Sequence, residues 1–81
     1  MANHHRINIL LLLASRNGDT VENLARELQA NFKTISQHTR YLAQAGLLRK
    51  RYRGRSVLNT LSPYGNAVAR FIRDFQRIGD L

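Results

Sequence analysis

The stretch NFKTISQHTRYLAQAG, residues 31–46, decides the fold that the sequence predicts. Asn31 is a favoured helix N-cap, and Gly46 is favoured where the backbone turns left-handed after a helix ends. The stretch therefore predicts a helix that begins after Asn31 and continues to about Ala45. At 100° per residue, one face of this helix collects the side chains that we assign to the core, namely Ile35, His38, Thr39 and Leu42.

The opposite face and its shoulders carry polar side chains and no glutamate. They supply the candidate DNA contacts of this helix: Phe32, Lys33, Thr34, Ser36, Gln37, Arg40, Tyr41 and Gln44. Lysine and arginine can read guanine in the major groove, and glutamine can pair with adenine. Because a recognition helix presents its N-terminal residues to the bases, Lys33 and Gln37 are expected at base edges. Arg40 and Tyr41 are better placed for the backbone. A merely solvated helix face would also be polar, and the absence of glutamate is what favours recognition.

Two helices are predicted before this one. The first spans about residues 3–15 and ends at a strong Asn-Gly turn signal. The second is expected to start at Asp19, with Glu22 three positions later in the spacing of a capping box, and to run to about Gln29. Two short helices in succession predict a helix-turn-helix.

A β-hairpin and a last helix are predicted after it. Residues 47–61 are rich in Arg, Tyr, Val, Leu and Thr and predict a hairpin with its turn near Arg53-Gly54. Ser62 and Pro63 then suit the N-cap and the first position of a helix. The order helix, helix, helix, hairpin, helix predicts a mainly α fold with a β-hairpin wing, a winged helix-turn-helix that occupies the whole chain as one domain.

The charge of the chain is concentrated in the middle third. Thirteen Lys and Arg against five Asp and Glu give the 81 residues a formal net charge of +8. Residues 31–61 hold seven of these cations and no acid. Five of the seven are the candidate DNA contacts of the wing: Arg49, Lys50, Arg51, Arg53 and Arg55. Charge that only protects an edge strand needs fewer cations, so this density favours contact with phosphates or with a narrow minor groove.

The composition also excludes several classes of protein. Without cysteine the chain has no disulfide, thiolate metal site or thiol nucleophile. The apolar run of residues 9–14 is far shorter than the roughly 20 residues that span a bilayer. His4 and His5 are adjacent and make a poor metal pair. Ser36 and His38 point in different directions and cannot form a nucleophile and base. We therefore expect no enzyme activity, no cofactor, no metal, no membrane contact and a cytoplasmic location.

The terminal helices predict a homodimer. Residues 9–14 are apolar all round, so a helix there must be covered on every side, and apolar patches of this size mark interfaces. The last helix adds an apolar stripe at helical spacing. The expected interface residues are Ile9, Leu12, Leu13, Val68, Phe71, Ile72, Phe75 and Ile78. The alternative is that both helices pack on each other within one monomer.

Residues 34–48 and 54–57 resemble the ArsR-type winged-helix repressors. They share a recognition helix with the pattern Ser-x-His, an exit with the pattern Leu-x-x-Ala-Gly-Leu, and a wing tip with Gly-Arg. Residues 61–65, LSPYG, are similar to the start of the last helix in MarR-type regulators. The resemblance implies a homodimer that is joined through its terminal helices and binds a two-fold-related operator.

The chain also departs from the ArsR-type pattern. Thr39 stands where the family usually has a core leucine, and Asn59 where the wing often has tyrosine. Metal-sensing members use a cysteine motif, or Asp and His ligands on the last helix. Because this chain has no cysteine and no histidine in its last helix, metal-responsive repression is not supported.

The sequence thus favours a sequence-specific regulator of transcription that binds double-stranded DNA as a homodimer. The helix of residues 32–45 would lie in the major groove, and the wing of residues 47–61 on the backbone or in the minor groove. Two alternatives stay open: a winged helix that binds DNA or RNA without sequence preference, and an interaction module that joins a larger complex through its terminal helices. The sequence identifies neither an operator nor a small-molecule effector.

Overall fold

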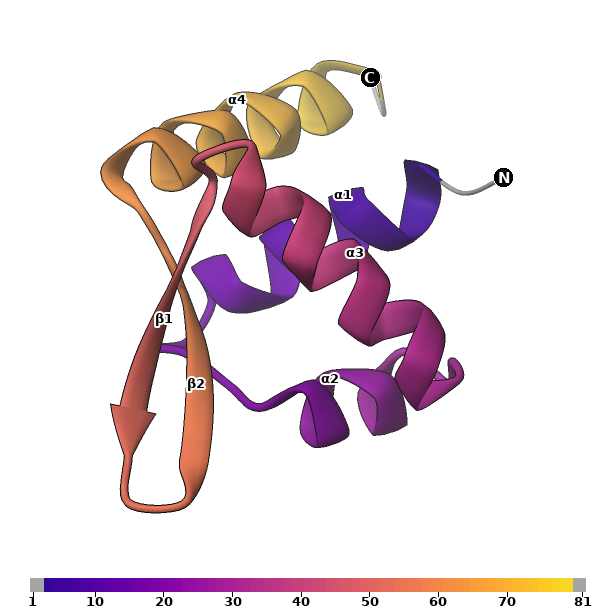
Figure 1. Cartoon of the computed structure of the whole chain (residues 1–81). Coiled ribbons are helices and arrows are strands. Elements are labelled where there is room, and N and C mark those ends of the chain that lie inside the picture. The colour runs from indigo at the N-terminus through magenta and orange to yellow at the C-terminus, as the bar shows by residue number, and fades with distance from the viewer. Residues whose placement is uncertain (1–2, 80–81) are drawn as a thin grey trace.

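The computed structural model describes residues 3–79. Its elements in chain order are α1 (Asn3–Ala14), α2 (Val21–Glu27), α3 (Phe32–Gln44), β1 (Leu48–Arg53), β2 (Ser56–Leu61) and α4 (Pro63–Gly79). This is the predicted order, and the prediction of a winged helix-turn-helix is confirmed. In Figure 1, α2 and α3 form the helix-turn-helix, and the antiparallel strands β1 and β2 form the wing.

The core is built around α1, which packs against α3, β2 and α4. Its residues Ile9 and Leu13 are buried in one cluster with Leu24 of α2 and with Ile35 and Leu42 of α3. Figure 1 shows α4 along one side of the molecule, α2 on the opposite side, and α3 crossing between them. The wing extends away from the helices (Figure 1), so the core holds α3 and the base of the wing in a fixed relation.

The start of α2 differs from the prediction. Thr20 is its N-cap, since the Thr20 Oγ1 accepts a hydrogen bond from the Asn23 amide at 3.2 Å. Asp19 lies outside the helix, where its backbone pairs with that of Asn59 on β2. The predicted capping box of Asp19 and Glu22 is therefore wrong, because pairing with the sheet keeps Asp19 out of the helical turn.

Both helices of the helix-turn-helix end on a left-handed residue. After α2, the Gln29 and Ala30 amides donate to the carbonyl oxygens of Arg26 and Ala25 at 3.2 and 2.9 Å. Gln29 has a φ of 52° and is the only non-glycine with positive φ within residues 3–79. The helix α3 ends in the same way on Gly46, at a φ of 83°, as predicted. Gly46 adopts this conformation without steric cost, whereas Gln29 does not.

The start of α4 packs directly on the exit from α3. The Ser62 Oγ accepts a hydrogen bond from the Gly65 amide at 2.9 Å and donates one to the Gly46 carbonyl at 2.6 Å. An added Cβ at Gly65 would lie 2.0 Å from the carbonyl oxygen of Leu47. The predicted start at Ser62 and Pro63 is confirmed, and the close backbone approach explains the glycine two positions after Pro63.

Candidate nucleic-acid interface

The helix α3 presents its polar face to solvent. Asn31 caps it, since its Oδ1 accepts a hydrogen bond from the Lys33 amide at 2.7 Å. The predicted core face is buried at Ile35, Thr39 and Leu42. Most of the predicted DNA contacts are exposed, namely Phe32, Lys33, Gln37, Arg40, Tyr41 and Gln44. Thr34 and Ser36, on the shoulders, are partly buried. Contact of these side chains with DNA stays a prediction.

One shoulder of α3 is tied to α1 through Arg6, a residue that the sequence did not single out. The Arg6 guanidinium lies 3.8 Å from the centroid of the Tyr41 ring. Its Nε donates a hydrogen bond to Nδ1 of His38 at 3.4 Å, across 32 positions of sequence. Burial lowers the pKa of His38, and the charge of Arg6 lowers it further, so His38 is a neutral acceptor at neutral pH. No local spacing pattern could have revealed a contact between residues so far apart.

The two faces of the wing carry different cations. Because strand side chains alternate between faces, Lys50 and Tyr52 lie on one face of β1, and Arg49 and Arg51 on the other. The first face looks toward the N-terminal end of α3, since Lys50 and Tyr52 line a cleft together with Phe32. Arg49 and Arg51 line a second groove, which Lys50 also borders. The sequence-based prediction treated all wing cations as one set, although the period of the strand could have divided them.

The cleft between α3 and the wing combines aromatic and basic side chains. It has a volume of about 350 Å³. Phe32 is 54% exposed and Tyr52 78% exposed, so both rings face solvent. Lys50 and Arg55 stand beside them, and Glu22 lies on the α2 side of the cleft. Such a surface suits a nucleic-acid backbone that passes between α3 and the wing.

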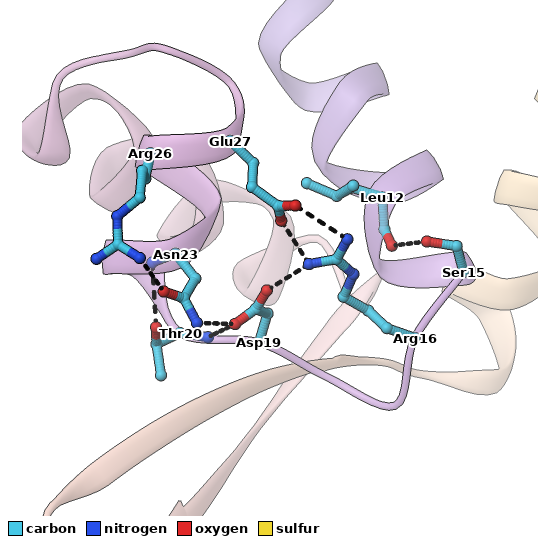
Figure 2. Close-up of polar contacts among 8 residues, drawn as sticks. All are labelled: Leu12, Ser15, Arg16, Asp19, Thr20, Asn23, Arg26 and Glu27. Carbon is cyan, nitrogen blue, oxygen red and sulfur yellow. Dashed lines mark hydrogen bonds and ion pairs between the residues drawn. The ribbon is translucent and has the colours of Figure 1, made fainter.

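Arg16 forms ion pairs with two acidic residues on the α1–α2 side of the molecule. Figure 2 shows its guanidinium between the carboxylates of Asp19 and Glu27 and bonded to both. Burial raises the pKa of Asp19. Hydrogen bonds from Asn23, Arg16 and the Thr20 amide outweigh that effect and hold the pKa of Asp19 below its ordinary value. Within residues 3–79, no cation of α3 or of the wing forms an ion pair, so their charge is open to an external anion.

Two of the eight residues expected at a dimer interface belong to the core of the monomer instead. Ile9 is 0% exposed and Leu13 2% exposed, because α3, β2 and α4 enclose α1. The expectation that these two residues contact a partner chain is therefore wrong. Three further residues are partly buried, namely Leu12, Val68 and Ile72. The exposed apolar side chains of this set lie on α4: Phe71, Phe75 and Ile78.

Two further histidines, His4 and His5, lie at the start of α1. Among residues 3–79, no group of three or more His, Cys, Asp or Glu side chains is arranged to hold a metal ion. The His4 and His5 rings lie in a tilted pair with centroids 4.2 Å apart. None of the helices in this range is both long enough and apolar enough to span a membrane.

More than half of the sequence matches a family of bacterial regulators. The family described as bacterial regulatory protein, arsR family, matches residues 3–50. The transcriptional regulator HlyU from Vibrio vulnificus CMCP6 is 30% identical, with a TM-score of 0.78 over 93% of this chain and 78% of that chain. Reduced HlyU from Vibrio cholerae N16961 is 28% identical, with a TM-score of 0.76 over 88% of this chain and 75% of that chain.

A structure solved with DNA shares the fold. FabT from Streptococcus pneumoniae in complex with DNA has a TM-score of 0.84 at 16% identity, over 90% of this chain and 53% of that chain. At this identity the likeness concerns the fold alone. No curated protein matches the sequence significantly.

Proposed function

The chain belongs to the ArsR family of bacterial regulatory proteins and has the fold of DNA-binding transcription regulators, and from this premise we propose that it binds specific double-stranded DNA sequences as a homodimer. In this proposal α3 lies in the major groove, and the wing contacts the backbone or the adjacent minor groove. The proposal includes a cytoplasmic location, where bacterial DNA lies.

The observation that carries the proposal is the unpaired positive charge that α3 and the wing share. Lys33 and Arg40 are exposed on α3, and Lys50 and Arg55 line the cleft that joins α3 to the wing. Figure 1 shows the N-terminal end of α3 and the turn of the wing on the side of the molecule away from α4. One duplex can therefore meet both elements, as phosphate contacts position the protein and base contacts select the sequence.

The contacts divide by chemistry. Lys33 and Gln37 lie in the first turns of α3, where a recognition helix meets base edges. Arg53 and Arg55 flank the turn of the wing and are both exposed, which suits phosphates or a narrow minor groove.

The dimer part of the proposal rests on α4. Phe71 and Phe75 are 68% and 67% exposed, with ring centroids 6.2 Å apart, and Ile78 continues this apolar strip. Aromatic side chains gain most when an interface buries them. A two-fold dimer joined there would set its recognition helices one DNA turn, about 34–36 Å, or a multiple of it apart.

Selection of bound duplexes from a random DNA library tests the specificity. An enriched palindrome with regularly spaced half-sites is the expected result. Binding without enrichment would contradict sequence recognition and favour a non-specific nucleic-acid binder. Absence of binding would favour an interaction module that uses α4. Sedimentation of the wild type and of Phe71→Asp then tests the dimer, because a charge at this position should leave only monomer.

The role of the wing tip is tested by salt dependence. Arg53→Ala with Arg55→Ala should weaken binding to all sequences alike and reduce the slope of log affinity against log salt by about 0.9 per lost phosphate contact. Arg70→Ala with Arg73→Ala removes the same charge from exposed positions of α4 and should leave the slope unchanged. Equal slopes for wild type and the wing-tip variant would remove the tip from the phosphate contacts.

A further inference from the structure

A second groove lies on the face of the wing opposite to Phe32, beside Arg49 and Arg51, which are also among the predicted DNA contacts of the wing. It has a volume of about 590 Å³ and lies between the end of α1, β1 and the first turns of α4. Gly18 packs tightly on the same face of β2, since an added Cβ there would lie 2.7 Å from the Thr60 side chain. Residues that line this rear groove include Arg16, Arg49, Lys50, Arg51, Leu61 and Asn66.

Three cations of β1 line the rear groove, namely Arg49, Lys50 and Arg51. Arg49 and Arg51 are two residues apart on one face of β1, so their side chains leave the strand about 7 Å apart. Both are exposed, and neither forms an ion pair within residues 3–79. No acidic residue is among those described as lining the groove. Arginine binds phosphate through paired N–H donors, and this spacing suits a mono- or diphosphate group.

The α1 wall of the groove is prearranged. Its cation, Arg16, is held in place by the carboxylates of Asp19 and Glu27 (Figure 2), whose two negative charges exceed its single positive charge. The attraction for an anion therefore comes from the β1 cations Arg49, Lys50 and Arg51.

The remaining surface of the groove suits an organic group. Ala14 and Leu61 are partly buried and form an apolar part of the lining, and the amides of Asn17 and Asn66 stand beside it. The volume lies within the range of small-molecule sites, about 300–1,000 Å³. A bare inorganic ion would leave the apolar part of the groove uncovered. The groove therefore fits an anion that also carries an uncharged organic part.

We propose that the rear groove binds a phosphorylated small molecule of nucleotide size. Its phosphate groups lie between Arg49 and Arg51, and its uncharged part covers Ala14 and Leu61. The ligand touches α1, the wing and α4 together and adds negative charge at the base of the wing. It therefore weakens the attraction of the wing for DNA phosphates. This last consequence rests on the proposed function, whereas binding in the groove does not.

Binding is tested on the full chain without DNA. Amide ¹H–¹⁵N spectra are recorded while ATP, inorganic pyrophosphate or adenosine is added. We expect ATP to shift amides of residues 13–17, 49–51 and 60–66, with pyrophosphate and adenosine each weaker. Arg49→Gln with Arg51→Gln should weaken ATP binding about tenfold or more, because two charge-assisted contacts are lost. Arg70→Gln with Arg73→Gln, which removes equal charge from α4, should bind ATP as the wild type does. Both positions on β1 are exposed, so the variant spectrum should show an intact fold.

Four results would overturn the site. If both double variants lost the same amount of ATP affinity, ATP would be attracted by the net charge of the chain alone. Shifts confined to α3 and the Phe32 side of the wing would place the anion on the DNA-binding surface. No shifts with any probe would exclude phosphorylated ligands of this kind. Shifts in the groove with a hexaglutamate peptide, but with none of the phosphate probes, would assign it to an acidic protein segment.

A separate measurement tests the regulatory consequence. The affinity for the selected duplex should fall when ATP occupies the groove, and should not fall in the Arg49→Gln, Arg51→Gln variant. An affinity that ATP does not change would overturn the coupling and leave the binding site intact. Failure to bind any duplex, with the spectral shifts still present, would overturn the proposed function alone.

Discussion

Asp19 and Asn59 exchange both of their backbone hydrogen bonds, at 3.1 Å from the Asp19 amide to the Asn59 carbonyl and at 2.8 Å in the reverse direction. The carboxylate of Asp19 meanwhile accepts hydrogen bonds from the Thr20 amide, the Asn23 side chain and Arg16, at 2.8, 2.9 and 2.7 Å (Figure 2). One residue therefore joins the wing to the start of the helix-turn-helix. The orientation of the wing relative to α2 depends on this junction.

Acid should destabilise the junction. The pKa of Asp19 in the folded chain lies below its ordinary value of 3.8, so its contribution to stability is complete above that pH and is lost as the pH falls through the folded pKa. Asp19→Asn should be less stable than wild type at neutral pH and should lose less stability in acid. Urea unfolding at a series of pH values measures both effects. Asp74→Asn, on the exposed side of α4, should keep the wild-type profile. An Asp19→Asn profile parallel to that of the wild type would contradict the prediction.

Asn59 should be replaceable by an apolar residue with a gain in stability. Its side chain is fully enclosed, and neither its Nδ2 nor its Oδ1 has a hydrogen-bond partner among the described residues. An unpaired buried polar group costs about 1–3 kcal/mol. Asn59→Leu, which has nearly the same shape, should raise the free energy of unfolding by about 1 kcal/mol or more in urea titrations. Asn59→Asp should lower it, because an unpaired charge would be buried. A less stable Asn59→Leu would show that the amide has a partner in solution.

Gly65 should tolerate no side chain. Because an added Cβ would lie 2.0 Å from the Leu47 carbonyl oxygen, α4 would have to move away from the exit of α3. Gly65→Ala should therefore lose about 1–3 kcal/mol of stability, the usual range for overpacking. Gly79→Ala is the matched control, since no atom of residues 3–79 beyond its own helix turn lies within 4 Å of its Cβ position. Thermal unfolding of the two variants distinguishes them, and equal midpoints would contradict the close approach.

Replacement of Gln29 by glycine should increase the stability of the fold. Gln29 holds a φ of 52°, and a left-handed backbone costs a residue with a side chain about 1–2 kcal/mol. Part of the gain is offset by the greater freedom of glycine in the unfolded chain, so Gln29→Gly should stabilise by about 0.5–1 kcal/mol. Gln29→Ala keeps the steric strain and should bring no such gain. If alanine and glycine stabilise equally in urea titrations, the strain at this turn is not the cause.

Gln37 should determine the preference at one base pair. It is exposed in the second turn of α3, and a lost pair of hydrogen bonds to a base should reduce discrimination there by about 1–3 kcal/mol. Competition between duplexes that differ at single positions measures this for Gln37→Ala. Gln76→Ala, on α4, is the control and should discriminate as the wild type does. Unchanged discrimination by Gln37→Ala at every position would show that this residue does not read sequence.

The sequence by itself determined the order of the elements and most of their ends. Helical spacing separated the buried Ile35 and Leu42 from the exposed face of α3, and Asn31 and Gly46 marked its limits. Ser62 and Pro63 did the same for the start of α4. These signals are local, because a cap or a helical face depends on residues within about four positions of each other. The wing was likewise predictable, with its turn one residue earlier than the Gly54-Arg55 loop observed.

Only the tertiary structure decided which side chains meet across the chain. Asp19 has the local signature of a cap, but pairing with Asn59, forty positions away, overrides it. The sequence left Ile9 and Leu13 as candidates for contact with a partner, but α3, β2 and α4 pack against α1 and bury both side chains. The contact of Arg6 with α3 and the rear groove beside Arg49 arise in the same way. Burial and pairing depend on where distant segments pack, and periodicity within one segment carries no information about that.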